Sequence, residues 1–167
     1  MANKERYFLA AQLAGAIHTD DEKRLLDYAA DIREQFGDET LLDAIRLSHL
    51  FCGFPKTIRS LNILPSLSTT SLPAPAANGE IKFREVYGND SGPVLSHLEK
   101  VDPITKQWVI DHAYGRVFAN SSFSLLEREM ASIFILTLGN CHQQAESHVR
   151  ACARHGADGD QLHQDAG

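Results

Sequence analysis

Side chains that could take part in catalysis lie along one face of a predicted helix near the end of the chain. Cys141, Gln144 and His148 are spaced i, i+3 and i+7, which places them on the same side of a helix. Glu129 falls in the first turn of the preceding apolar segment, so an antiparallel helical hairpin would bring it near His148. A carboxylate that orients an imidazole is an arrangement typical of general acid/base catalysis. We therefore predict that Glu129 and His148 form a catalytic pair, with Cys141 in the same pocket.

Three stretches around these residues resemble the carboxymuconolactone decarboxylase and alkylhydroperoxidase D superfamily. Residues 111–118 are similar to the family's Tyr-Ala-Trp-Gly segment, and residues 125–156 to its His-bearing helical hairpin. Residues 41–55, which end in Gly-Phe-Pro, are similar to the helix that closes the family domain. That closing helix normally follows the His-bearing helix, so its N-terminal place here indicates a circularly permuted or two-half arrangement. The resemblance implies an alkylhydroperoxidase D-like bundle of helical hairpins.

The resemblance separates two chemistries within the superfamily. Peroxidase members carry a Glu, a Cys-x-x-Cys pair and then a His, which correspond here to Glu129, Cys141, Gln144 and His148. Gln144 therefore stands where those members have their second cysteine. Cys152 lies 11 residues beyond Cys141, about 16 Å along a helix, which is too far for a disulfide. Decarboxylase members lack the cysteine pair and keep the His, as this chain does.

For the decarboxylase class, the resemblance implies loss of CO2 from a small carboxylated lactone or oxo acid without a cofactor. His148 would protonate the carbanion-like intermediate, and neighbouring donors would hold the developing oxyanion. Gln144, as an orienting amide, and His112 and Tyr114, in the stretch 111–118, are the candidate pocket residues.

Two alternatives to the decarboxylase remain open. The chain could reduce hydroperoxides through Cys141 and an external thiol. It could also be a non-catalytic oligomeric scaffold of the same fold. We predict no metal site, because His142 and His148 are six residues apart on different helix faces and no paired-cysteine spacing exists.

The elements that must position these residues are helical throughout. Apolar residues recur at helical spacing, and no alternating run or hairpin signal favours a strand. Two Ser/Thr-x-x-Glu sequences predict helix starts as capping boxes, one at Thr19 and Glu22 and one at Ser124 and Glu127. We therefore predict a single all-α domain.

This domain would consist of two helical halves, residues 1–64 and 80–167. The segment that joins them, residues 65–79, is rich in Pro, Ser and Ala, which is typical of an extended linker. The helix predicted from residue 125 is apolar almost all round, so protein must surround it. This requirement and the resemblance both point to a homo-oligomer, and the resemblance implies a trimer or hexamer.

Composition limits the classes of partner. The chain has 167 residues and a formal net charge of −6, with no basic stripe that would bind nucleic acid. No apolar run approaches the roughly 20 residues that span a bilayer, and no signal peptide is visible. Three cysteines do not form a disulfide framework. We expect a soluble, cytoplasmic protein with a small-molecule substrate.

Overall fold

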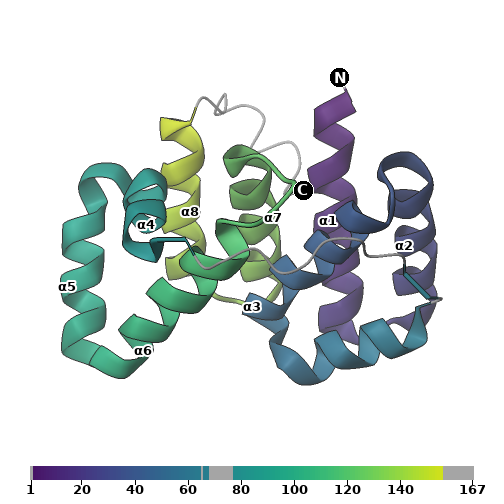
Figure 1. The fold of residues 1–167 in the computed structure, drawn as a ribbon, viewed down its shortest axis with the longest axis horizontal. Helices are drawn as coiled ribbons and strands as arrows, with labels where there is room; N and C mark the ends of the chain where they lie inside the picture. Colours follow the sequence, from purple (N-terminus) through teal and green to yellow (C-terminus); the bar gives the residue numbers. More distant parts are fainter. Residues whose placement is uncertain (1, 65, 68–76, 156–167) are drawn as a thin grey trace. The chain divides into compact units, whose positions relative to one another are not determined.

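The computed structural model describes residues 2–64, 66–67 and 77–155, and its side chains from residue 6 onward (Figure 1). Within these ranges the chain forms helices and no strand, which confirms the all-α prediction for this part of the protein. Most of the predicted linker at residues 65–79 lies outside the described residues. The chain divides into two compact units, described separately below: unit 1 comprises Met1–Thr70 with Ser122–Gly167, and unit 2 comprises Ser71–Ser121.

These units do not coincide with the halves predicted from the sequence. The predicted C-terminal half contributes its last two helices to unit 1, which also contains the first three helices of the chain. The helices of unit 1 are α1 (Ala2–Thr19), α2 (Glu22–Phe36), α3 (Asp38–Ile63), α7 (Leu125–Leu138) and α8 (His142–Arg154).

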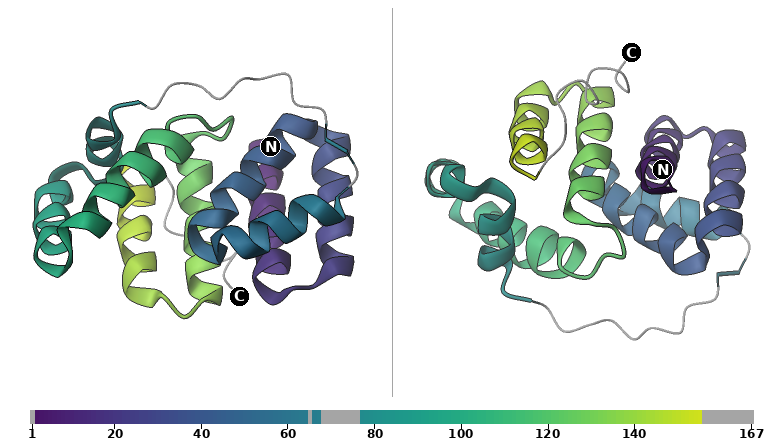
Figure 2. Two further views of the ribbon diagram at one scale, coloured as in Figure 1. Left: turned by 60° about the horizontal axis from the view of Figure 1, so that its bottom comes forward. Right: turned by 90° about the horizontal axis from the view of Figure 1, so that it is seen from above.

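Four helices of unit 1 run side by side in the order α8, α7, α1 and α2, and α3 crosses one face of α1 and α2 (Figure 2). The apolar helix α7 therefore lies between α1 and α8 of its own chain. Gly15 marks how close α1 and α7 come, because a Cβ added there would be 3.1 Å from a methyl carbon of Leu138. The core between α1, α2 and α3 is formed by buried aliphatic side chains, including Leu13, Ile17, Leu25, Ile32, Leu41 and Ile45.

The start of α7 follows the prediction. Ser124 accepts a hydrogen bond from the backbone N–H of Glu127, and the Glu127 carboxylate accepts one from the backbone N–H of Ser124, at 2.7 Å. This reciprocal pair is the predicted capping box. It sets the first residue of α7 and hence the position of Glu129 along the helix.

The start of α2 differs from the prediction. Asp21 is the N-cap, and its carboxylate accepts a hydrogen bond from the backbone N–H of Arg24 at 3.1 Å. Thr19 instead ends α1, where its hydroxyl donates to the carbonyl of Gly15 at 2.9 Å. The Thr19–Glu22 capping box was therefore wrong, because a competing acceptor sits closer to the helix start.

Unit 2 is built on a π-helix. Its elements are α4 (Gly79–Tyr87), the 3₁₀ turn η1 (Gly88–Asp90), α5 (Ser91–Val101), α6 (Pro103–Trp108) and the π-helix η2 (Val109–Phe118). Helix α4 packs directly on η2 at Gly79, where an added Cβ would lie 1.9 Å from the carbonyl oxygen of Ile110. The backbone N–H of Ala77 donates to the carbonyl of Gly115 at 2.8 Å, which ties the entry to α4 to the same helix.

Candidate functional site

Glu129 and His148 meet in the α7–α8 hairpin of unit 1, as predicted. The Nδ1 atom of His148 lies 2.6 Å from Oε2 of Glu129. Both side chains are buried, with 0% of Glu129 and 7% of His148 exposed. Because the two helices are antiparallel and joined by a short turn, the N-terminal part of α7, which carries Glu129, faces the middle of α8. The structure thus brings together the two residues assigned to acid/base chemistry.

This contact orients the imidazole. A carboxylate oxygen can only accept here, so Nδ1 carries the proton of this hydrogen bond and the tautomer follows from the partner. Nε2 is then the ring nitrogen that does not face Glu129.

The second oxygen of Glu129 is unusual. Oε1 is buried, and it accepts no hydrogen bond from the described residues. A buried acceptor without a partner costs stability, so natural proteins retain few of them. Packing within the described part of the hairpin therefore leaves one oxygen of Glu129 unsatisfied.

Cys152 is a neighbour of the pair that the sequence analysis did not assign to the site. It lies one helical turn after His148, and none of its surface is exposed. Burial raises the pKa of the Cys152 thiol to about 12, and the nearby charge of Glu129 acts in the same direction. Cys152 is therefore a neutral thiol and a poor nucleophile at physiological pH. In the sequence, the i, i+4 spacing between His148 and Cys152 was the signal that could have placed Cys152 beside the pair.

Cys141 and Gln144 do not share the burial of the pair. Cys141 is exposed at the N-cap position of α8, and its thiol donates to the carbonyl of Gly139 at 3.5 Å. Seven residues separate it from His148, which is about 10 Å along a helix. Gln144 is exposed, one turn before His148. Neither side chain contributes to the contact between Glu129 and His148.

His112 and Tyr114 belong to unit 2. Tyr114 is buried in an aromatic cluster, where its hydroxyl donates to the hydroxyl of Tyr87 at 3.2 Å and its ring meets the edge of Phe83 with centroids 4.8 Å apart. His112 is half-buried in the same π-helix. The position of Tyr114 is accounted for by packing within its own unit.

The described residues contain no group of three or more His, Cys, Asp or Glu side chains placed to hold a metal ion. Of the helices that the structure describes, none has the length and apolar character to cross a membrane.

A comparison with known proteins finds a distant relative. The chain is 28% identical over 138 residues to Peroxisomal protein 2 of Schizosaccharomyces pombe (strain 972 / ATCC 24843), an alignment that covers 73% of this chain and 63% of that protein. The chain thus spans less than two thirds of the length of this relative. No protein-family profile matches the chain. No solved structure gives a significant match either. The name of the relative states a compartment and no reaction.

Proposed function

We propose that this chain is a cofactor-free, decarboxylase-type enzyme that acts on a small carboxylated lactone or oxo acid. The observation that carries the proposal is the buried hydrogen bond of 2.6 Å between Glu129 and His148. The resemblance of residues 125–156 to the His-bearing hairpin of the carboxymuconolactone decarboxylase superfamily supports the same reaction class and an alkylhydroperoxidase D-like bundle.

The proposed reaction uses His148 as the acid. The bond between the substrate carboxylate and its neighbouring carbon breaks, CO2 leaves, and the electron pair moves into the adjacent carbonyl as an enolate. The imidazolium of His148 donates the proton of Nε2 to that carbon, and solvent returns a proton to the ring. Glu129 holds the ring in place and stabilises its charged form throughout.

Release of CO2 from a panel of carboxylated lactones and β-oxo acids tests this proposal. We expect wild-type protein to accelerate CO2 release for at least one compound. His148→Ala should lower that rate by about 100-fold or more, the range of a lost general acid, and keep the circular dichroism spectrum. Absence of turnover across the panel, or an unchanged rate in a folded His148→Ala variant, would contradict the proposal.

Reduction of hydroperoxides at Cys141 is the second candidate, favoured by the exposure of this thiol at the start of α8. The thiolate would attack the peroxide, forming a sulfenic acid and releasing an alcohol, and an external thiol would reduce the sulfenic acid. Peroxide consumption that is fast in wild type and absent in Cys141→Ser would favour this candidate. Absence of both activities would leave the non-catalytic scaffold.

The assembly and the location of the protein are also proposals. Following the resemblance, we propose a homo-oligomer of three or six chains. The cytoplasmic location stays a prediction, and the name of the relative offers the peroxisome as the alternative. Fluorescence imaging of the tagged full-length protein beside a peroxisomal marker distinguishes the two compartments.

A further inference from the structure

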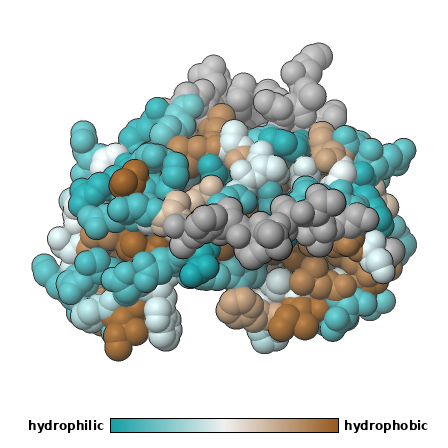
Figure 3. Space-filling model, viewed as in Figure 1, coloured by the Kyte–Doolittle hydropathy of each residue, from teal (hydrophilic) through white to brown (hydrophobic). Residues whose placement is uncertain are grey.

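Asn78 and Gly79, at the start of α4, form a dipeptide with a chemistry that the proposed reaction does not use. In an Asn-Gly sequence the backbone nitrogen of the glycine can attack the side-chain amide of the asparagine, because glycine has no Cβ to hinder the approach. Asn78 alone among the asparagines of the chain precedes a glycine. It is exposed, and many hydrophilic side chains lie on the visible surface over α4 and α5 (Figure 3). Water, which this chemistry consumes, therefore reaches the dipeptide.

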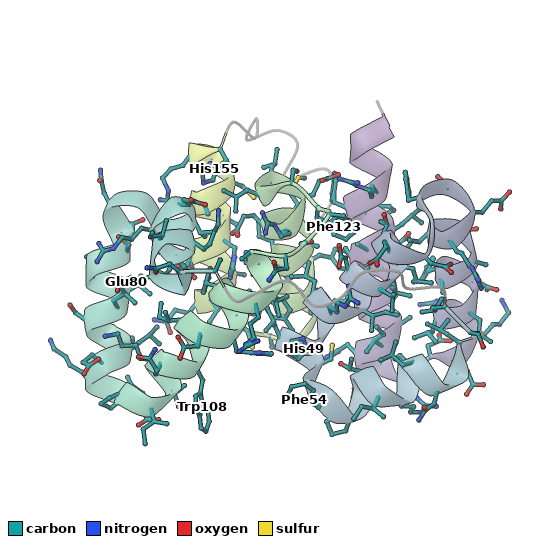
Figure 4. The ribbon with its side chains drawn as sticks, in the orientation of Figure 1. His49, Phe54, Glu80, Trp108, Phe123 and His155 are labelled. Atoms are coloured by element: carbon teal, nitrogen blue, oxygen red, sulfur yellow. The ribbon has the colours of Figure 1, made fainter. Side chains whose placement is uncertain are left out.

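The side chain of Asn78 is restrained as the N-cap of α4. Its Oδ1 accepts hydrogen bonds from the backbone N–H groups of Glu80 at 3.1 Å and Ile81 at 3.2 Å. Glu80, in the first turn of this helix, is labelled in Figure 4. The two bonds hold the amide against the rotation that an attack on Cγ requires. The nitrogen of Gly79, the first of α4, has no carbonyl partner within the helix, so it is a possible nucleophile.

The backbone on both sides of Asn78 is fixed against η2. The N–H of Ala77 donates to the carbonyl of Gly115 at 2.8 Å. Gly79 is buried, and a Cβ added to it would lie 1.9 Å from the carbonyl oxygen of Ile110 and 3.0 Å from the nitrogen of Gly115. The segment 77–79 is therefore held at both ends, and the docked helix leaves no space in which its backbone can rearrange.

We propose that Asn78 is a deamidation site that the docking of α4 on η2 keeps closed, and that its reaction leaves unit 2 permanently open. The nitrogen of Gly79 bonds to Cγ of Asn78 and loses its proton, and the side-chain nitrogen leaves as ammonia. Water then adds to either carbonyl of the resulting cyclic imide and breaks that carbon–nitrogen bond. The product is an aspartate or an isoaspartate, and water is the only co-reactant.

The two products differ in whether α4 can dock again. An aspartate keeps the length of the backbone and supplies a carboxylate that caps the helix as the amide did. An isoaspartate carries the main chain through Cβ, which adds a methylene between Ala77 and Gly79. Because the contact with Ile110 has no space even for one added carbon on Gly79, the longer segment cannot make this contact and the Ala77–Gly115 bond together. The isoaspartyl form therefore stays open.

Phe83 provides a way to open α4 without changing the reacting dipeptide. Its ring is 1% exposed, stacks on Tyr87 with centroids 4.3 Å apart, and meets the edge of Tyr114 on η2 with centroids 4.8 Å apart. Phe83→Ala removes this contact between α4 and η2. Ile81, on the same helix, is 55% exposed, so Ile81→Ala is the matched control.

This inference goes beyond the proposed reaction and does not rest on it. Mass spectrometry of the full-length protein during incubation at pH 8 and 37 °C measures deamidation at Asn78. We expect wild type to react at least about tenfold more slowly than a peptide of residues 77–83, because α4 must first open locally. Phe83→Ala should raise the rate by about tenfold or more, and Ile81→Ala should leave it unchanged. Equal rates in wild type and the peptide, or in wild type and Phe83→Ala, would overturn the proposal.

The reacted protein gives a second readout that does not depend on the folding of a variant. The aspartyl and isoaspartyl forms of wild type are separated by chromatography, and amide hydrogen exchange is measured in each. The isoaspartyl form should lose protection in α4 and η2, whereas the aspartyl form and the Asn78→Asp variant should exchange as unreacted protein does. Equal protection in both forms would show that the added methylene does not prevent docking, which contradicts the proposal.

Discussion

Arg6 and Glu127 form a two-pronged ion pair, although 121 residues separate them in the chain. Nε of Arg6 lies 2.9 Å from Oε1 of Glu127, and Nη2 lies 2.6 Å from Oε2. The guanidinium also stacks over the ring of Phe123, 5.1 Å from its centroid. Because Glu127 is also part of the Ser124 capping box, this pair joins α1 to the first turn of α7, two residues before Glu129.

Removing this ion pair should lower stability. In Glu127→Gln we expect the free energy of unfolding to fall by about 2 kcal/mol at pH 7, less than for a fully buried pair because Arg6 stays partly exposed. Urea denaturation followed by circular dichroism measures the change. Asp27→Asn, which removes the exposed Lys23–Asp27 pair, is the control and should change stability by less than about 0.5 kcal/mol. Equal losses of unfolding free energy in the two variants would show that the Arg6–Glu127 pair stabilises the fold no more than an exposed ion pair does.

The contribution of Glu127 should also depend on pH. Burial raises the pKa of Glu127, but hydrogen bonds from Arg6 and Ser124 outweigh it and hold the pKa below its ordinary value. A carboxylate whose folded pKa is lowered stabilises the fold above its unfolded pKa, about 4.3, and loses this effect as the pH falls through the folded value. The difference in stability between wild type and Glu127→Gln should therefore be constant above pH 5.5 and shrink below pH 4.5. A difference that grows on acidification would contradict the assigned sign.

The contact between α4 and η2 in unit 2 predicts a sharp contrast between two glycines. Gly79→Ala would place a Cβ 1.9 Å from the Ile110 carbonyl oxygen. Because this oxygen belongs to the backbone, the η2 backbone itself would have to move to relieve the clash. We expect a loss of about 2–3 kcal/mol and faster amide hydrogen exchange in α4 and η2. Gly92→Ala, in α5 with no atom near the added Cβ, should be neutral or stabilising by up to about 1 kcal/mol. Similar behaviour of the two variants would refute the close approach.

The three cysteines should react in a fixed order with a thiol reagent at pH 8. Cys141 is exposed and should react first, and Cys52, whose pKa burial raises, should follow slowly. Cys152, with a pKa of about 12, should react only after the addition of denaturant. Mass spectrometry of labelled peptides measures each rate. Early labelling of Cys152 would mean that the α7–α8 hairpin opens far more readily than its burial indicates.

Local signals predicted the elements that depend on neighbours in the sequence. The Ser124–Glu127 capping box is present because no stronger acceptor competes with it, whereas Asp21 displaced Thr19 at the start of α2. The contact between Glu129 and His148 followed from hairpin geometry, since a short turn sets which residues of two helices face each other. These inferences needed only helical period and turn length.

Other features depend on contacts that no local pattern encodes. The π-helix at 109–118 lies against the backbone of Gly79, and the sequence pattern predicted only an ordinary helix there. The ion pair between Arg6 and Glu127 joins residues that are 121 positions apart in the chain. The grouping of α7 and α8 with α1, α2 and α3 likewise depends on tertiary contacts between distant segments. This explains why the predicted halves and the observed units differ.

We propose that the pair of Glu129 and His148 transfers protons to carbon, and hydrogen exchange of a product tests this proposal most directly. The decarboxylated product of an active panel compound is incubated with the protein in D2O, and deuterium at the carbon that lost CO2 is followed by NMR. Because the same groups act in both directions, wild type should catalyse this exchange, Glu129→Gln should slow it, and His148→Ala should lower it by about 100-fold or more. Equal exchange in wild type and a folded His148→Ala variant, or none in wild type, would contradict the account.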